Sequence, residues 1–213
     1  MGRFEEFLEH RSEEIDSVRQ EWLWIKEDIE GYKYPLEDWP HIKSIAKNYV
    51  KNFGVVVQAG GLQGMYPRLF SEFFERVYTF EPDPLSFTCL VHNCQKDNIV
   101  KLQSAVGDEL GMVDIKREFI SNAGMNTVTP GNQIPMLTID SIQLDACDLI
   151  QLDVEGYESK VICGAMKTIE KFKPIVIAEA RFFHNKEELD RLMQSISYDP
   201  VFIYHCDLVY APR

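Results

Sequence analysis

The sequence has no Cys-x-x-Cys pair and no histidine at the spacing of a zinc ligand, although it contains five cysteines. This pattern argues against a zinc site, and an odd number of cysteines is typical of free thiols in a reducing compartment. No stretch approaches the ~18 apolar residues of a membrane span. The first six residues, Met-Gly-Arg-Phe-Glu-Glu, lack the apolar core of a signal peptide. We therefore expect a soluble, cytoplasmic protein that makes no membrane contact.

Clusters of positive charge are also missing. The chain has 34 acidic residues against 22 Lys and Arg, which gives a net charge of −12, and no run of Lys or Arg interrupts this balance. An acidic chain repels phosphate backbones, so we expect no nucleic-acid partner. Repeats and low-complexity segments are absent as well. The 213 residues, 45% of them hydrophobic, are enough for one domain with an appendage.

One stretch near the first quarter of the chain organises the remainder. Three consecutive valines, Val55–Val57, predict a buried strand, and the glycine-rich segment Gly60–Gly64 follows it directly. Met65–Arg76 is then predicted to be a helix. Glycine allows such a turn and lets a ligand lie against bare backbone, while the helix N-terminus offers free N–H groups. Strand, loop and helix together predict the first half of a nucleotide-type binding unit.

Strands and helices alternate from there to the end of the chain. This alternation predicts an α/β fold with a mostly parallel sheet. The last two strands are separated only by a tight turn, so they must be antiparallel. Residues 112–119 are predicted to pair at an edge, and 121–135 to form a loop. The expected strands are Val77–Glu81, Val100–Val106, Leu149–Val154, Ile175–Glu179, Val201–Tyr204 and Leu208–Tyr210, and the expected helices are Leu85–Gln95, Glu158–Phe172 and Lys186–Ile196.

The N-terminal segment Phe4–Glu30 has the pattern of one long amphipathic helix. Its stripe packs on the main domain in one interpretation and forms a homodimer seam in the other, because the spacing also matches a heptad. The stripe consists of Ile15, Val18, Trp22, Ile25 and Ile29.

A linker rich in aromatic residues, Gly31–Pro40, follows, and it forms either a wall of the pocket or ordinary packing. A second helix is predicted over His41–Asn52. These features suggest a helical extension with its linker over residues 1–52 and a binding domain over 53–213.

Glu81 ends the second predicted strand, 21 residues after Gly60. A carboxylate at that position suits the two hydroxyl groups of a ribose. The glycines stand at 60, 61 and 64, so the G-x-G-x-x-G fingerprint of dinucleotide binding is incomplete. The looser G-x-x-x-G spacing favours a ligand with an amino-acid tail, such as S-adenosylmethionine. The structural alternative is a tight turn beside a solvated glutamate.

A second motif spans Asp148–Glu158 and contains two acidic residues, Asp153 and Glu155, at the carboxyl end of a predicted buried strand. Open α/β sheets bind their ligands at this edge. Acidic side chains are costly there unless they are solvated, paired or coordinating. A functional role is therefore favoured over a structural one.

With these motifs the chain resembles the FkbM family of S-adenosylmethionine-dependent methyltransferases, and within it the compact members met in bacteriophage genomes. The resemblance covers about Asn52 to Tyr210. One position departs from the family pattern, since Gln58 stands where an aspartate usually opens the glycine motif. The segments that carry the resemblance are Val57–Gly64, Phe80–Pro84 with Leu90 and Asn93, Ala105–Asp108, Thr138–Ile142, Leu152–Glu158, Gly164–Ala165 and Pro174–Glu179.

The resemblance implies a class I methyltransferase fold, Rossmann-like, with a mostly parallel seven-stranded sheet and an antiparallel last strand. It also implies that S-adenosylmethionine is the cofactor, S-adenosylhomocysteine the product, and a hydroxyl of a sugar or glycan the acceptor. Glu81 would hold the ribose, and Asp153 would face the amino group or the sulfonium. The residues implied in cofactor binding are Gln58, Ala59, Gly60, Gly61, Leu62, Gly64, Glu81, Pro82, Asp83, Ser104, Ala105 and Asp153.

A hydroxyl acceptor reacts faster when a base takes its proton. The candidates are Asp153, Glu155, Glu179 and His184, the last in a predicted loop. Asp153 with Glu179 could instead hold Mg²⁺ or another hard cation. Two other functions stay open: a binding module that keeps the cofactor without turnover, and a nicotinamide-dependent oxidoreductase, which the glycine spacing disfavours.

Overall fold

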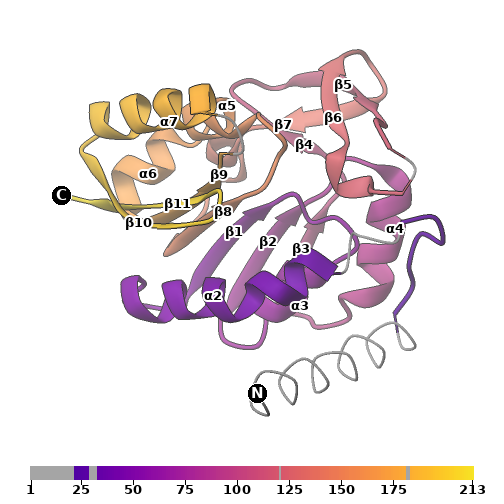
Figure 1. The fold of residues 1–213 in the computed structure, drawn as a ribbon, viewed down its shortest axis with the longest axis horizontal. Coiled ribbons are helices and arrows are strands. Elements are labelled where there is room, and N and C mark those ends of the chain that lie inside the picture. Colours follow the sequence, from indigo (N-terminus) through magenta and orange to yellow (C-terminus); the bar gives the residue numbers. More distant parts are fainter. Residues whose placement is uncertain (1–21, 29–32, 120, 181–182) are drawn as a thin grey trace, which may run out of the picture.

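The computed structural model describes residues 22–28, 33–119, 121–180 and 183–213 (Figure 1). Its main sheet has seven strands in the order β10-β11-β9-β8-β1-β2-β3. All neighbours are parallel except β11, which is antiparallel to both β9 and β10. The predicted sheet is therefore confirmed, with its antiparallel last strand. The strands are β1 (Val55–Ala59), β2 (Arg76–Phe80), β3 (Ile99–Leu102), β8 (Leu149–Leu152), β9 (Ile175–Glu179), β10 (Tyr198–Tyr204) and β11 (Asp207–Pro212).

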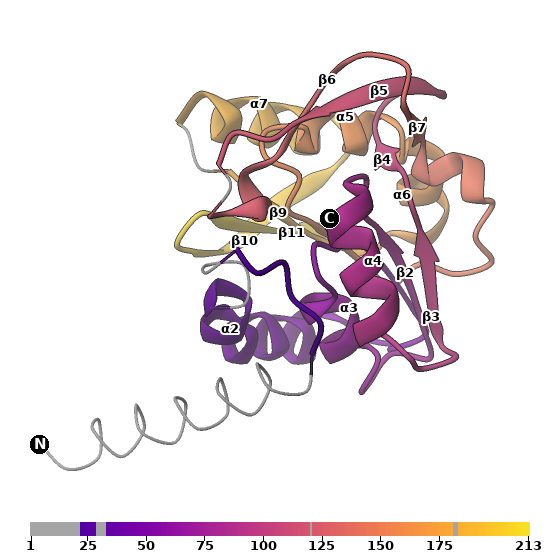
Figure 2. The ribbon, with the colours of Figure 1, turned by 90° about the vertical axis from the view of Figure 1, so that its right-hand side faces the viewer.

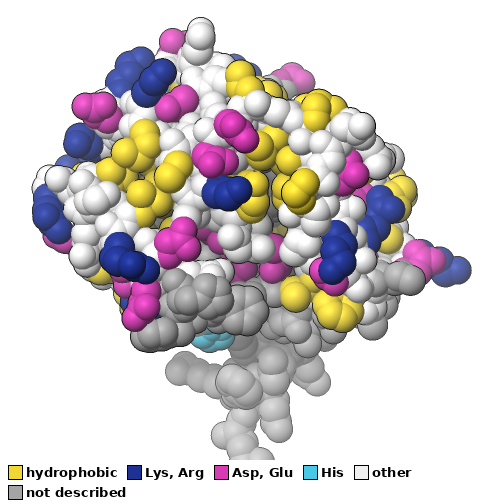
Figure 3. Space-filling model, turned by 90° about the horizontal axis from the view of Figure 1, so that it is seen from above, with side chains coloured by type: hydrophobic (Ala, Val, Ile, Leu, Met, Phe, Trp, Pro, Cys, Tyr) yellow, Lys and Arg dark blue, Asp and Glu magenta, His cyan; other side chains and the backbone are white. Residues whose placement is uncertain are grey.

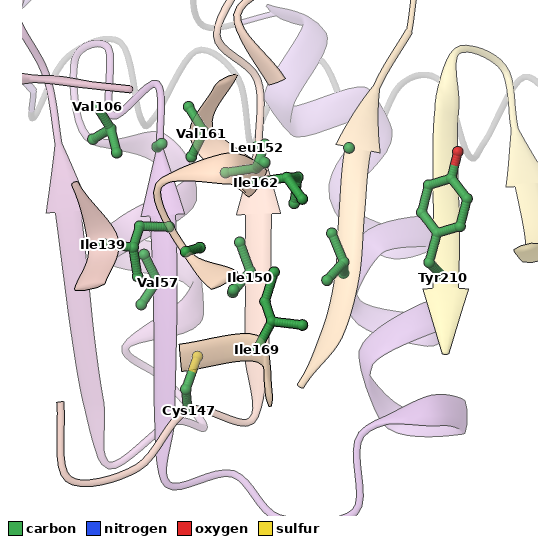
Figure 4. Packing of buried hydrophobic residues seen from close by; sticks show 14 of the residues in the cluster. Val57, Val106, Ile139, Cys147, Ile150, Leu152, Val161, Ile162, Ile169 and Tyr210 are labelled. Atoms are coloured by element: carbon green, nitrogen blue, oxygen red, sulfur yellow. The ribbon is translucent and has the colours of Figure 1, made fainter. Parts of the chain in front are cut away.

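Helices cover both faces of this sheet (Figures 1 and 2). Side chains alternate along a strand, so Val56 packs with α2, α3 and α4, whereas Val57 packs with α5, α6 and α7. Figure 4 shows the second of these layers, with Val57 and Ile150 facing Ile162 and Ile169. The helices are α2 (Lys33–Tyr49), α3 (Met65–Phe70), α4 (Pro84–Asn93), α5 (Glu158–Cys163), α6 (Met166–Phe172) and α7 (Phe183–Ser195).

A second, smaller sheet follows β3 and was largely missed by the sequence analysis. Its order is β4-β7-β5-β6, and Val113 and Met136 are among its buried residues. The predicted strand Val100–Val106 is wrong as a single element, because β3 and β4 belong to different sheets. The predicted loop 121–135 is also wrong, since it contains a 3-10 turn, β6 and the start of β7. The elements are β4 (Ala105–Val106), β5 (Gly111–Lys116), η1 (Ala123–Met125), β6 (Thr127–Pro130), β7 (Ile134–Leu137) and η2 (Ile139–Ile142).

Two predicted helices differ from the observed ones, one in length and one in continuity. The helix predicted over Met65–Arg76 ends at Phe70, and the one predicted over Glu158–Phe172 is broken into α5 and α6. The break has a steric reason at Gly164, where a β-carbon would lie 2.0 Å from the carbonyl oxygen of Gly107. Glycine therefore lets the junction approach the backbone that follows β4.

The predicted helix Phe4–Glu30 is wrong over residues 22–28, the part of it that the structure describes. These residues form an irregular strap. The backbone N–H of Leu23 donates to Asn93 Oδ1 at 2.8 Å, and that of Ile25 donates to Gln63 Oε1 at 2.7 Å. Side chains distant in sequence thus take the donors that a helix would use. Residues 1–21 and 29–32 lie outside the described part, so the dimer seam stays a prediction.

The linker predicted over Gly31–Pro40 is wrong from Lys33 onward, because α2 already begins at that residue. Pro35 falls in the first turn of this helix, where the missing N–H of a proline costs the helix no hydrogen bond. Trp39 packs edge-on against Phe70, with ring centroids 5.5 Å apart, so the packing interpretation holds for this aromatic residue. None of the helices in the described ranges is long and apolar enough to cross a membrane.

Candidate active site

A cavity of about 450 Å³ opens where β1, β2, β8 and β9 end. This is the edge at which open α/β sheets bind their ligands. The segment 122–128, which leads into β6, forms part of the wall. The described residues that line the cavity are Asp38, Ala59, Gly60, Gly61, Leu62, Met65, Tyr66, Phe80, Glu81, Pro82, Ser104, Ala105, Val106, Asn122, Ala123, Gly124, Asn126, Val128, Gln151, Asp153, Val154, Glu155, Tyr157, Glu179, His205, Cys206 and Asp207.

The glycine loop packs tightly between the ends of β2 and β8. The N–H groups of Gly60 and Gly61 both donate to the carbonyl oxygen of Phe80, at 3.1 and 2.9 Å. Gly60 has a φ of +88°, and a β-carbon on it would lie 1.9 Å from the carbonyl oxygen of Asp153. Only glycine satisfies both conditions, so this residue brings the loop into contact with the backbone of Asp153.

Gln58 lies beneath the loop and does not line the cavity. Its amide donates from Nε2 to the carbonyl oxygen of Gly60 at 2.8 Å and accepts from Thr79 Oγ1 at 2.6 Å. The side chain is fully buried. The amide that replaces the family's aspartate therefore supports the loop from below.

Glu81 projects into the cavity from the end of β2. It holds both the glycine loop and the turn that follows β2. Its two oxygens accept hydrogen bonds from the N–H groups of Leu62, at 2.7 Å, and Asp83, at 2.8 Å. Burial raises the pKa of Glu81 to about 8, although both hydrogen bonds act in the opposite direction. Each oxygen keeps acceptor capacity for a ligand's hydroxyl groups.

Asp83 does not line the cavity but ties the second sheet to the main one. It caps α4 by accepting from Leu85 N–H at 2.8 Å. It also accepts from Arg117 Nε at 2.7 Å and from Asn126 Nδ2 at 3.1 Å, one residue on each side of the β5–β6 connection. Burial would raise the pKa of Asp83, but the hydrogen bonds from Arg117 and Leu85 outweigh it and lower this pKa. Gly64, predicted to bind cofactor, also lies outside the lining, where it precedes α3 as its N-cap.

Three acidic residues come together at the other end of the cavity. Asp153, Glu155 and Glu179 each offer a carboxylate oxygen, and these oxygens lie within 4.8 Å of one another. Glu155 has a φ of +52° in the turn after β8. The carboxylate of Glu158 holds this turn by accepting from the N–H groups of Val154 and Gly156, at 3.1 and 3.2 Å. The sequence motif is thus two acids that line the cavity, Asp153 and Glu155, followed by Glu158, which fixes the turn between them.

Burial raises the pKa of Asp153, and the neighbouring charges of Glu179 and Glu155 raise it further. Cys206, in the turn between β10 and β11, donates its thiol to Glu179 Oε1 at 3.2 Å. Burial also raises the pKa of Tyr66, and the negative charges of Asp153 and Asp207 raise it further.

Carboxylates dominate the charge of this cavity. Among the lining residues of the described ranges there are six acids and no Lys or Arg, and Figure 3, which looks down on this side, shows acidic side chains near the middle of the face. The acids are Asp38, Glu81, Asp153, Glu155, Glu179 and Asp207.

Most of the predicted site residues therefore meet in one cavity. His184 falls in the first turn of α7 and not in the predicted loop, and its side chain lies outside the described part. The residues of the lining that the sequence did not predict include Asp38, Tyr66, Gln151 and the 122–128 wall. Gln151 carried a signal, because a polar side chain in the middle of an apolar strand is unusual.

The strand order, the glycine loop, the acid that ends β2 and the acids that follow β8 together define a class I methyltransferase fold with its cofactor cleft. The family model described as Methyltransferase FkbM domain matches residues 67–203. The chain therefore belongs to the FkbM family of S-adenosylmethionine-dependent methyltransferases. No curated protein matches the chain.

Solved structures share this fold at low sequence identity. The FkbM methyltransferase from Methylobacillus flagellatus KT has a TM-score of 0.53 at 17% identity, covering 92% of this chain and 57% of its own. The ribosomal protein L11 methylase from Lactobacillus delbrueckii subsp. bulgaricus has 0.52 at 9%, covering 84% and 79%. The precorrin 8w decarboxylase from Methanobacterium thermoautotrophicum has 0.50 at 13%, covering 83% and 90%. The present chain thus spans little more than half of the solved FkbM protein.

Proposed function

We propose that the protein transfers a methyl group from S-adenosylmethionine to a hydroxyl group of a sugar or glycan. One observation carries this proposal: a single cavity has Glu81 at one end, three clustered carboxylates at the other, and the glycine loop between them. This arrangement would hold a ribose at one end and an acceptor hydroxyl at the other, with the methionine part of the cofactor between them.

The lining residues fit the parts of the cofactor. The carboxylate of Glu81 suits the ribose hydroxyls, and Gly60 lets the loop that lines the cavity lie directly against the backbone of Asp153. Ser104 is buried beside them, and its hydroxyl has no hydrogen-bond partner among the described residues. A polar ligand edge, such as that of adenine, would satisfy this hydroxyl. Ala59, Leu62, Pro82 and Ala105, which the family resemblance implies in cofactor binding, also line the cavity.

The bound cofactor supplies an electrophilic methyl group, and the chain's own residues align and deprotonate the acceptor. A carboxylate of Asp153 or Glu179 takes the proton from the hydroxyl group. With S-adenosylmethionine bound, the hydroxyl oxygen would form its bond to the methyl carbon as the carbon–sulfur bond breaks, and sulfur would keep the electron pair. Burial and the charges of Glu179 and Glu155 raise the pKa of Asp153, which makes its carboxylate a stronger base than an exposed one.

The test uses S-adenosylmethionine labelled in its methyl group, offered with neutral sugars, glycans, sugar nucleotides and small alcohols. We expect base-stable label in a neutral sugar or glycan, together with S-adenosylhomocysteine. Calorimetry with S-adenosylmethionine, S-adenosylhomocysteine and NAD accompanies it. Tight cofactor binding without transfer to any acceptor would favour the binding module, and binding of NAD alone would favour an oxidoreductase.

A further inference from the structure

The three clustered carboxylates have the spacing of ligands around one ion. Oxygens bound to one cation lie at most about 4.2 Å apart around Mg²⁺ and about 5 Å apart around Ca²⁺, since these limits are twice the bond lengths. The oxygens of Asp153, Glu155 and Glu179 lie within 4.8 Å of one another, which is inside the limit for Ca²⁺, whereas Mg²⁺ would draw them closer together. All three come from the ends of adjacent strands or the turn behind one of them. The fold therefore holds three hard oxygen ligands at a single point.

Gln151 gives a second and independent indication. Its side chain is 2% exposed, it lines the same cavity, and its Oε1 has no hydrogen-bond partner among the described residues. The hydrogen bond from Asp153 N–H to the carbonyl oxygen of Ala59 extends the β1–β8 ladder to Asp153. Gln151 and Asp153 are thus two positions apart on one strand and point to the same face. A buried amide oxygen without a partner is costly unless a ligand satisfies it.

The strand register places the acids side by side above this glutamine. Leu152 pairs with Ala178 across β8 and β9, so Asp153 and Glu179 are the next pair along the same two strands. Glu158 fixes the turn that carries Glu155 through its two backbone hydrogen bonds. Carboxylate and amide oxygens are the ligands that hard divalent cations prefer.

We propose that Asp153, Glu155, Glu179 and the amide oxygen of Gln151 form a binding site for one hard divalent cation, Mg²⁺, Mn²⁺ or Ca²⁺. The proposal of this site rests on these contacts alone and does not depend on whether the protein transfers a methyl group. Where the proposed function also holds, the cation lies at the acceptor end of the cavity, so that it favours acceptors whose neighbouring hydroxyl groups can chelate it.

The experiment titrates the full chain, without cofactor or acceptor, with MnCl₂ while the signal of free Mn²⁺ is followed by electron paramagnetic resonance. We expect one saturable site per chain. Competition with MgCl₂ and CaCl₂ then identifies the preferred ion. Glu155→Gln should weaken the binding of Mn²⁺ at least about tenfold, which corresponds to about 1.4 kcal/mol. Because neither cofactor nor acceptor is present, this result is independent of whether methyl transfer is found.

Two further variants separate a built site from general attraction to an acidic protein. Gln151→Met removes the amide oxygen without changing the net charge, and it should also weaken Mn²⁺ binding. Glu75→Gln removes one exposed charge just before β2, at the opposite edge of the sheet, and should bind Mn²⁺ like the wild type. Circular dichroism checks that each variant is folded. Absence of a saturable site in the wild type, or wild-type affinity in both Glu155→Gln and Gln151→Met, would overturn the proposal.

Discussion

At the scale of single residues, Glu81 makes cofactor affinity depend on pH. Burial raises its pKa to about 8, so the side chain is largely protonated in the unliganded protein at neutral pH. Ribose hydroxyls donate to a carboxylate, and their binding therefore favours the ionised form. The affinity for S-adenosylhomocysteine should rise with pH between 6 and 8, by up to tenfold per pH unit, and level off above.

Calorimetry in two buffers of different ionisation enthalpy measures this effect, because it counts the proton released on binding. Glu81→Gln is the control, since its binding should be weaker and show no release. Equal affinity of the wild type at pH 6 and 9 would place the ribose elsewhere.

The raised pKa of Glu81 also affects the stability of the fold. The unliganded protein should lose stability as pH rises from about 4.5 to 8, since the unfolded chain gives up this proton first.

Asp153 provides a second prediction at this scale. Asp153→Asn keeps the shape of the side chain but removes its charge. If it is the base, turnover should fall by about 10²–10⁴-fold while the dissociation constant of S-adenosylhomocysteine stays within a few-fold of the wild type. Single-turnover kinetics with labelled cofactor, together with calorimetry, separates the two quantities. A loss of cofactor affinity as large as the loss of turnover would show that Asp153 orients the cofactor instead.

The sequence predicted Glu81, Asp153 and Glu179 because each stands where an apolar strand ends, and that position alone aims a side chain at the cleft. It did not predict Asp38, because α2 begins eight residues earlier than expected. The helix carries this residue to the cavity through packing that only the tertiary fold determines. Gln58 was assigned to the glycine motif, but whether it contacts the ligand or the backbone depends on Thr79 on the next strand.

At the scale of elements, the strap of residues 22–28 supports the cofactor loop through Asn93. The amide of Asn93 donates to the carbonyl oxygens of Leu23, at 2.9 Å, and Gln63, at 2.7 Å, and accepts from Leu23 N–H. Asn93→Ala should lower the free energy of unfolding by about 1–3 kcal/mol, because it leaves buried backbone groups unsatisfied. It should also weaken cofactor binding, since Gln63 adjoins Leu62 in the loop.

Urea denaturation and calorimetry check this prediction. His92→Ala changes the neighbouring, exposed position of α4 and should leave both quantities unchanged. If Asn93→Ala loses stability but binds the cofactor like the wild type, the strap supports the fold without supporting the loop.

The elements that the sequence analysis predicted well are the ones with a local cause. The three valines of β1 and the run Ile-Val-Ile of β9 are short, apolar and β-branched, a pattern that by itself predicts a buried strand. β6 was missed because Thr127–Pro130 is only partly buried and is followed by Gly131, a pattern that local rules assign to a loop. The helix expected through Trp22 and Ile25 failed for a different reason. Its periodic stripe was real, but Gln63 and Asn93 compete for the backbone donors.

At the scale of the whole molecule, the net charge of −12 bears on the class of partner. Nucleic acids are the partners that such a charge disfavours most, so RNA is the partner to test. We expect no binding of a labelled RNA hairpin at physiological ionic strength, because an acidic surface gains nothing from counterion release. Fluorescence anisotropy up to the highest soluble protein concentration measures this. Saturable, salt-sensitive binding would contradict this prediction.

The close contact between Gly60 and the carbonyl oxygen of Asp153 has a consequence for any attempt to change what the protein methylates. Gly60, proposed to face the cofactor, and Asp153, proposed to face the acceptor, touch through their backbones, with no side chain between them to absorb a shift. Redesign that displaces Asp153 will therefore disturb the cofactor loop as well. Altered acceptor preference is easier to reach by exchanging the 122–128 wall, which borders the same cavity but is held through the side chain of Asp83.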